Sequence, residues 1–474
     1  MWKVFDTDGQ ASFASVSGDF NPMHMDALEA RRTQAGAPLV HGVHALLWLL
    51  DALAERQAGL PRAASLQVRF QRMIYVGDRA QGEILSVSSS ELRARILAGG
   101  AQAVGISMGF GTGRERGSPP RIAGAGEALL SPPTVPCDIS LDEMAGRRGR
   151  LSFATAPERV ARMFPHAARH WGPRRIAALA CSSCLVGMVV PGRHSLFGGL
   201  DVNVCDDGMA ADELKFAVES VDERFRLVRL SVLGGGLVGS LTTSSRPPPV
   251  AQPRMAVVAT KVSPAEFRDS TALVIGGSRG LGELTAKLIA AGGGRVIVTY
   301  ASGAADAAAV ACEIREAGGY CRTSRYDVRE SPVPQLAALG DSPTHVYYFA
   351  TPTIARRKAG VCDLQRLQEF NSFYVGGFLE LVLACAGARP EGVKVFYPST
   401  VYVESRPTEL TEYAMAKAAG EILCADLNTH LGGVRVLVRR LPRVPTDQTS
   451  SLLPLETADA LEVMLPIVRE MHRA

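Results

Sequence analysis

The sequence contains no apolar run as long as the roughly 18–20 residues that a membrane-spanning helix requires. Its two longest apolar stretches, residues 43–54 and 178–190, are interrupted by polar side chains and are predicted to form buried helices. The first ten residues lack the basic-then-apolar layout of a secretory signal peptide. We therefore expect no membrane partner and a cytoplasmic location.

Dense basic segments are also missing. The 51 Lys and Arg residues and the 47 Asp and Glu residues nearly cancel and are spread along the chain, so nothing favours binding to nucleic acid. Nine cysteines stand at irregular spacings and predict reduced thiols rather than a disulfide framework. Hydrophobic residues make up 47% of the chain and charged residues 21%, which excludes disorder and indicates an ordinary globular protein.

The chain has 474 residues, enough for about three domains. The clearest linker is TTSSRPPPVAQP, residues 242–253, whose four prolines predict neither a central strand nor a helix. We expect this Pro-rich linker to extend over residues 242–264.

After the linker, β-like and α-like patterns alternate, which predicts an α/β doubly wound parallel sheet over residues 265–474. The expected strands and helices are residues 272–275, 284–291, 295–300, 304–317, 346–349, 367–386, 393–397, 412–431 and 434–439.

Before the linker, a long apolar helix followed by antiparallel strands is predicted twice. The helices are expected at residues 41–55 and 176–188. The expected strands are residues 65–74, 81–88, 200–204, 213–218 and 225–233. This order predicts an internal structural repeat, with one half at residues 1–125 and the other at residues 126–241.

The first chemical motif is S-G-D-F-N-P-M-H at residues 17–24, on a loop that precedes the apolar helix. A carboxylate and an imidazole held together, here Asp19 and His24, can orient one water and shuttle its protons. Gly42 opens the helix, where free backbone N–H groups can stabilise an oxyanion. Such parts suit the addition of water to an α,β-unsaturated thioester, or its removal. Turn chemistry with a helix cap is the alternative reading of a bare Asp and His.

The whole string resembles the signature of the MaoC-like (R)-specific enoyl-thioester hydratase/dehydratase family, with Phe13 and Ala30 at its flanking positions. The resemblance implies a hot-dog fold, Asp19 and His24 as the catalytic pair, Asn21 as a supporting polar group and Gly42 as an oxyanion donor. The second half lacks the string, so a double hot-dog with one degenerate half is expected, its motif-less half shaping the acyl tunnel. We expect His194 to be structural, and Cys181 and Cys184 to be buried free thiols rather than metal ligands.

The second chemical motif is T-A-L-V-I-G-G-S-R-G-L-G at residues 271–282, a short strand, a glycine loop and the start of a helix. Gly276, Gly280 and Gly282 permit the close approach of a pyrophosphate to a helix N-terminus. Ser302 follows the second strand where an NAD site places an acid, and Arg279 can pair with a 2′-phosphate. The sequence therefore predicts NADPH rather than NADH.

Tyr413 and Lys417 stand four residues apart on a predicted helix and so share a face. A nearby ammonium is expected to lower the pKa of the phenol and make Tyr413 a proton donor. Ser399 follows a predicted strand and is expected to hold a substrate carbonyl, with Thr400 as the alternative. A Tyr/Lys pair on a helix is by itself usually only a solvated face.

As a set, these residues resemble the short-chain dehydrogenase/reductase family, which implies that Asn371, Ser399, Tyr413 and Lys417 are catalytic. The expected cofactor-binding residues are Gly276, Ser278, Arg279, Gly280, Leu281, Gly282, Ser302, Asp327, Val328, Tyr413, Lys417 and Thr446. The sequence departs from the family pattern in three places: A-T-P at residues 350–352, Arg443 where Gly is usual, and one extra residue between Ser399 and Tyr413.

Together the two sets predict a bifunctional enzyme with no metal: a 3-oxoacyl-thioester reductase and a 3-hydroxyacyl-thioester dehydratase or enoyl hydratase, in fatty-acyl or polyketide-type metabolism. The carrier is coenzyme A or an acyl-carrier protein, and a homo-oligomer is expected by analogy with both families. One alternative is a reductase of a non-thioester carbonyl whose hot-dog part binds acyl groups or dimerises. A second is a cofactor-sensing regulator without chemistry, which would not need the proton donor.

Overall fold

The computed structural model describes residues 1–57, 59–111, 128–205, 211–354, 360–452 and 455–473. The chain forms two compact units. Unit 1 comprises Met1–Pro248 with Ser451–Pro454, and unit 2 comprises Pro249–Ser450 with Leu455–Ala474. Each unit encloses hydrophobic clusters of its own.

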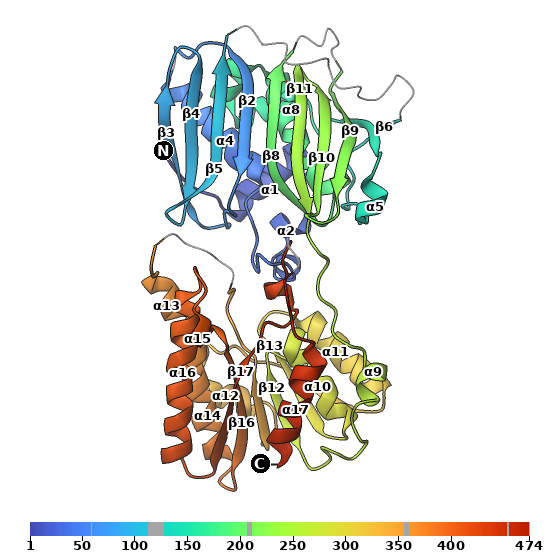
Figure 1. The fold of residues 1–474 in the computed structure, drawn as a ribbon, viewed down its shortest axis with the longest axis vertical. Helices are drawn as coiled ribbons and strands as arrows, with labels where there is room; N and C mark the ends of the chain where they lie inside the picture. The colour runs from blue at the N-terminus through green and yellow to red at the C-terminus, as the bar shows by residue number, and fades with distance from the viewer. Residues whose placement is uncertain (58, 112–127, 206–210, 355–359, 453–454, 474) are drawn as a thin grey trace. The chain divides into compact units, whose positions relative to one another are not determined.

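Unit 1 is built on one large sheet that contains eleven strands within the described residues, in the order β1-β3-β4-β5-β2-β8-β11-β10-β9-β7-β6 (Figure 1). Apart from the parallel pair β6 and β7, neighbouring strands are antiparallel. The strands are β1 (Trp2–Val4), β2 (Ala63–Phe70), β3 (Arg79–Val87), β4 (Glu91–Ala98), β5 (Ala101–Phe110), β6 (Leu129–Leu130), β7 (Arg148–Ser152), β8 (Ser195–Val204), β9 (Glu213–Asp222), β10 (Leu227–Gly234) and β11 (Leu237–Ser245).

The strand order repeats across the middle of this sheet. The run β3-β4-β5-β2 is mirrored by the run β9-β10-β11-β8, and the two runs join where β2 pairs with β8 between Ser65↔Asn203 and Arg69↔Gly199. This confirms the predicted double hot-dog. The expected boundary between the halves, after residue 125, falls outside the described residues.

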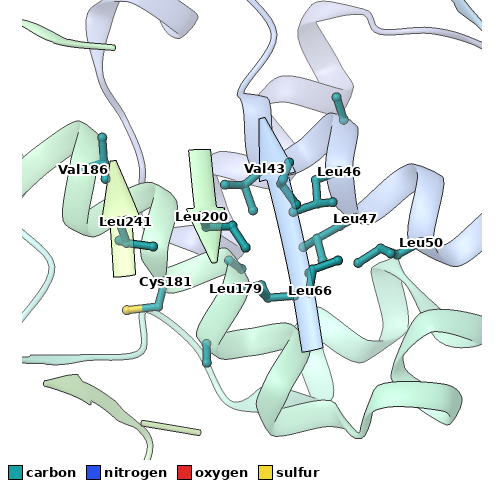
Figure 2. Close-up of a cluster of buried hydrophobic side chains, with 14 of the residues drawn as sticks. Val43, Leu46, Leu47, Leu50, Leu66, Leu179, Cys181, Val186, Leu200 and Leu241 are labelled. Carbon is teal, nitrogen blue, oxygen red and sulfur yellow. The ribbon is translucent and has the colours of Figure 1, made fainter. Parts of the chain in front are cut away.

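Each half of unit 1 contributes one long apolar helix to the core: α4 (Gly42–Arg56) and α8 (Pro173–Cys184), which continues into a π-helical turn, Leu185–Val189. Figure 2 shows side chains of α4, such as Leu46 and Leu47, near Leu66 of β2 and Leu179 of α8. The remaining helices are α1 (Thr7–Ser17), α2 (Pro22–Met25), α3 (Ala27–Ala30), α5 (Leu141–Met144), α6 (Pro157–Met163) and α7 (Pro165–Trp171).

The predicted linker was wrong at its start and in its content. Residues 242–245 complete β11, a strand inside the sheet, and Thr243 is completely buried. These Ser and Thr residues have the backbone N–H groups that a strand needs, and the prolines begin only at Pro247. Within the expected linker, Met255–Ala259 form helix α9, which packs into the core of unit 2.

Unit 2 is the predicted doubly wound α/β fold. Its described residues form a six-stranded parallel sheet in the order β14-β13-β12-β15-β16-β17. The strands are β12 (Thr271–Ile275), β13 (Arg295–Tyr300), β14 (Tyr320–Arg325), β15 (His345–Tyr348), β16 (Val393–Thr400) and β17 (Val434–Leu441). The other helices are α10 (Gly280–Ala291), α11 (Ala304–Glu316), α12 (Pro332–Ala337), α13 (Leu364–Asn371), α14 (Gly377–Ala388), α15 (Tyr402–Ser405), α16 (Thr411–His430) and α17 (Ala460–Arg473).

Helices α13 and α14 join through a π-helical turn into one helical stretch, Leu364–Ala388. By length and composition alone this stretch could cross a membrane. Its Tyr374, Phe378 and Leu381 side chains, however, belong to a hydrophobic cluster of unit 2 that includes strand residues of the sheet. The absence of a membrane partner stays a prediction.

Candidate active sites

The loop that carries Asp19 leaves α1 through a tight turn at Gly18. Gly18 has φ +80°, and its N–H donates to the carbonyl of Ala14 at 2.8 Å, which ends the helix. A side chain at Gly18 would also lie 3.2 Å from Cys184 Sγ of α8. This turn places the Asp19 side chain in the interior of unit 1, only 2% exposed.

Asn21 fastens the same loop. Its Oδ1 accepts a hydrogen bond from the N–H of Met23 at 3.0 Å and so caps α2. Its Nδ2 donates to the carbonyls of Gly187 at 2.7 Å and Gly192 at 3.1 Å, both in the second half. The fully buried Asn21 therefore ties the motif loop to the half that lacks the motif.

His24 lies on α2 with one ring nitrogen already engaged. Its Nδ1 is 2.8 Å from the carbonyl of Leu39, so this nitrogen carries the proton and Nε2 is left as the proton acceptor of the neutral ring. The rings of His24 and His41 stack with centroids 4.0 Å apart. One carboxylate oxygen of Asp19 and one ring nitrogen each of His24 and His41 all lie within 4.8 Å of one another.

Burial controls the protonation of this pair. Burial raises the pKa of Asp19, against the opposing effects of His24, the hydroxyl of Ser183 and the backbone N–H of Asn21. Burial lowers the pKa of His24, although the Asp19 charge opposes it. The site therefore favours a neutral imidazole, which can accept a proton, beside a carboxyl group that can hold one.

The pair faces a cavity of about 310 Å³ in unit 1 whose lining includes Asp19, His24 and Gly42. Gly42 is the first residue of α4, where a backbone N–H has no partner inside its own helix. A side chain at Gly42 would come within 3.0 Å of the Phe70 ring at the cavity wall. Asp19, His24 and Gly42 are thus brought together as the sequence predicted.

Sequence reasoning missed Ser183. Its hydroxyl donates to Oδ2 of Asp19 at 2.6 Å, and it also lines the cavity. Ser183 lies on α8, and one serine in an apolar helix without a motif carries no signal of this role.

The other candidate groups of unit 1 are His194 and the two cysteines of α8. His194 is not among the cavity-lining residues and lies 3.2 Å from a carboxylate oxygen of Asp138. Cys181 and Cys184 are free and buried, and burial raises the pKa of Cys181 to about 12. The two cysteines are thus buried free thiols, as the sequence predicted, and the structural role of His194 stays a prediction.

In unit 2, the glycine loop joins β12 to α10. Gly276 and Gly280 adopt positive φ angles of 73° and 58°, which side chains rarely tolerate. A side chain at Gly282 would lie 2.3 Å from the carbonyl oxygen of Gly276, so the helix can approach the strand this closely only with glycine. The arrangement leaves the N–H groups at the start of α10 available to a phosphate.

The other predicted cofactor residues surround this loop or the neighbouring strand ends. Arg279 forms an ion pair with Asp447 at 3.0 Å, and Thr446 approaches Gly280. The side chain of Asp327, after β14, is paired with Arg329 at 2.6 Å, which lowers the pKa of the carboxyl group. The remaining positions are buried Ser278 and Val328, partly buried Leu281 and exposed Ser302.

The structure pairs Tyr413 with Thr400 rather than with Ser399. The hydroxyl of Thr400 acts on the phenol of Tyr413 and lowers its pKa, whereas Ser399 donates to the carboxylate of Glu421. Successive residues of β16 point in opposite directions, so only one of the two hydroxyls can face Tyr413. The surroundings of the two hydroxyls favour the alternative, Thr400, for the role expected of Ser399.

Lys417 and Tyr413 share a face of α16, and both contact the ring of Tyr374. Lys417 Nζ donates to the carbonyl of Pro398 at 2.6 Å, and burial lowers the pKa of Lys417 to about 7. The predicted lowering of the Tyr413 pKa was wrong, because burial raises it in this structure. Desolvation outweighs the influence of an ammonium that is itself losing its charge.

Two further positions singled out in the sequence, Asn371 and Arg443, have defined structural settings. Asn371 ends α13, and the π-helical turn begins directly after it, a feature often found at functional sites. The rings of Phe370 and Tyr413 are in contact, with centroids 5.6 Å apart, which brings this helix end beside Tyr413. Arg443 donates to the carbonyl of Thr449 and so braces the short loop after β17.

Comparison with known proteins gives two domain matches. The model of the MaoC like domain matches residues 3–102, and the model of the short chain dehydrogenase matches residues 270–338. The chain is 35% identical over 86 residues to an (R)-specific enoyl-CoA hydratase of Aeromonas caviae, which covers 17% of this chain and 62% of the hydratase.

The chain is also 28% identical over 99 residues to a mitochondrial 3-hydroxyacyl-[acyl-carrier-protein] dehydratase of Arabidopsis thaliana. The matched stretch covers 20% of this chain and 57% of the dehydratase. The chain thus spans about three fifths of the length of these curated relatives. A 3-oxoacyl (acyl-carrier-protein) reductase of Agrobacterium tumefaciens, solved with NADP bound, has 18% identity and a TM-score of 0.38, covering 43% of this chain and 88% of that structure. The chain thus carries a stretch similar to the MaoC like domain in unit 1 and a stretch similar to the short chain dehydrogenase in unit 2.

Proposed function

We propose that this chain is a bifunctional enzyme acting on acyl thioesters. Unit 2 reduces a 3-oxoacyl thioester with NADPH, and unit 1 dehydrates the (R)-3-hydroxyacyl product or hydrates the enoyl thioester. The observation that carries the proposal is the pairing of buried Asp19 with partly buried His24 at the cavity that Gly42 also lines. The names of the two curated relatives, a hydratase and a dehydratase of acyl thioesters, support the substrate class.

In unit 1, dehydration removes a proton from C2 and the hydroxyl from C3. His24 Nε2 is the free proton acceptor and carries the proton between the carbon and the departing oxygen. Asp19 orients the water or takes the second proton, for which its raised pKa suits it. The N–H of Gly42 at the start of α4 stabilises the thioester oxygen as negative charge develops.

In unit 2, a bound nicotinamide supplies the hydride that reduces the carbonyl carbon. Tyr413 protonates the carbonyl oxygen. Thr400, whose hydroxyl acts on the phenol of Tyr413, donates a hydrogen bond to the same carbonyl oxygen. Lys417 binds the ribose, and Asn371 supports the proton relay. Gly276, Gly280 and Gly282 fit a dinucleotide because the positive φ angles of Gly276 and Gly280 and the close approach of Gly282 to the Gly276 carbonyl favour glycine. Arg279 provides the cation for the 2′-phosphate.

The two reactions follow one another, since the product of the reductase is the substrate of the dehydratase. Their presence in one chain raises the effective concentration of the intermediate at the second site. Purified protein, NADPH and acetoacetyl-coenzyme A, followed by mass spectrometry, test this directly. Appearance of both 3-hydroxyacyl and enoyl products supports the proposal. Reduction of a non-thioester ketone without thioester turnover would replace it with the alternative reductase function.

A further inference from the structure

We infer that Ser183, from the half of unit 1 that lacks the motif, is a positioning residue for the hydratase/dehydratase site. The inference rests on the proposed function of Asp19 and His24. It assigns to the second half a part in the chemistry itself, beyond shaping the cavity.

The contact that carries the inference is buried and short. Ser183 is 4% exposed, and its hydroxyl donates to Asp19 Oδ2 at 2.6 Å. Oδ1 of the same carboxylate accepts the N–H of Asn21 at 3.2 Å. Each carboxylate oxygen therefore accepts a hydrogen bond from one donor. The donor to Oδ2, Ser183, lies on α8, 164 positions along the chain from Asp19.

The neighbouring backbone of the second half is shaped for the same carboxylate. At Gly187, a Cβ atom would lie 2.3 Å from Oδ1 of Asp19, so any side chain there would displace the carboxyl group. The carbonyl of Gly187 accepts the side-chain amide of Asn21 at 2.7 Å. Ser183 thus holds the Asp19 carboxylate by a hydrogen bond, and Gly187 leaves the space that the carboxylate occupies.

The Ser183 hydroxyl influences the protonation of Asp19 as well as its position. The titratable or charged groups that act on the pair are His24 from α2, His41 beside α4, Cys184 from α8 and Arg246, which follows β11. Burial raises the pKa of Asp19 while the Ser183 hydroxyl opposes that rise. Loss of the hydroxyl is therefore expected to move the pKa of Asp19 further upward.

The adjacent serine provides a matched control. Ser182 is 3% exposed on the same helix, but its hydroxyl donates to the carbonyl of Leu179 at 2.6 Å and takes no part in holding Asp19. Removal of either hydroxyl leaves an alanine in α8, so a purely structural effect of the substitution should be similar at the two positions.

The experiment measures hydration of crotonyl-coenzyme A and, in the same preparations, NADPH-dependent reduction of acetoacetyl-coenzyme A. In Ser183→Ala we expect kcat for hydration to fall about 10- to 100-fold, because a buried charge-assisted hydrogen bond and the alignment of Asp19 are lost. KM should change less than about threefold, and the acid limb of the kcat/KM profile should move to higher pH. Ser182→Ala should stay within about twofold of the unaltered chain, and reduction should be unchanged in both variants.

Gly187→Ala should also displace the Asp19 carboxylate, because the new methyl group would clash with it. We expect kcat for hydration to fall at least about tenfold in this variant while reduction persists. Hydration by Ser183→Ala at the unaltered rate and pH profile would overturn the inference, as would equal losses in Ser182→Ala and Ser183→Ala. If the unaltered chain hydrates no enoyl thioester, the proposed function fails, and the inference with it.

Discussion

Replacing Thr400 by alanine should disable the reductase, whereas replacing its neighbour Ser399 should not. Thr400→Ala removes the hydroxyl that acts on the phenol of Tyr413 and lowers its pKa. Loss of one donor aimed at a reacting oxygen typically lowers kcat by about 10²- to 10³-fold, or about 3–4 kcal/mol of transition-state stabilisation. We expect that loss in kcat for acetoacetyl-coenzyme A, with the Kd for NADPH unchanged.

In Ser399→Ala, the hydroxyl lost is one that binds Glu421, and Arg440 still holds that carboxylate at 2.6 Å. A hydrogen bond to a charged group that keeps another partner is worth about 1–2 kcal/mol of stability. In a domain of this size that lowers Tm by about 2–8 °C. The assay is steady-state oxidation of NADPH followed by absorbance, with thermal unfolding alongside. A greater loss of kcat in Ser399→Ala than in Thr400→Ala would refute the reasoning.

Three further predictions concern the two units separately. Asp19→Asn should lower hydration at least about 100-fold while reduction is unchanged, measured by product mass spectrometry, and equal hydration by the variant would contradict the role of Asp19. Arg279→Ala should raise the Kd for NADPH at least about tenfold and leave the Kd for NADH within about twofold, measured by calorimetric titration; equal losses for both cofactors would exclude 2′-phosphate recognition. Burial lowers the pKa of His44 to about 3, so below pH 6.5 the unfolded chain binds a proton that folded unit 1 does not. The free energy of unfolding is therefore highest above pH 6.5 and falls by about 2 kcal/mol between pH 7 and pH 5. Urea unfolding should show this loss and show less of it in His44→Gln, and an identical loss in that variant would refute the assignment.

The sequence was most informative where one site is encoded on one short segment. Asp19, Asn21 and His24 stand on a single loop, so their spacing already predicted a pair, and the glycines of residues 276–282 predicted a phosphate loop in the same way. Alternating apolar patterns likewise predicted both sheets, because each long element buries one face. These expectations agree with the positions that the elements take in the structure.

Ser183 could not be found in this way. It reaches Asp19 only because β2 pairs with β8 and brings the two halves together, and that pairing leaves no local signature near Ser183. The choice between Ser399 and Thr400 depended on which way one residue of β16 points, and both residue types are suitable donors. The start of the linker was predicted wrongly because Thr242–Ser245, which precede the prolines, continue strand β11.

The junction between β2 and β8 also removes a constraint on how unit 1 can change. In a sheet assembled from two identical chains, each substitution appears on both sides of the symmetry axis, so every copy must keep a complete motif and a suitable partner surface. Here backbone hydrogen bonds within one chain replace that axis. One half can therefore keep the motif loop while the other carries residues such as Ser183 and Gly187, which contact Asp19 of the motif half. Covalent linkage thus permits a division of labour that a symmetric dimer of identical halves cannot adopt.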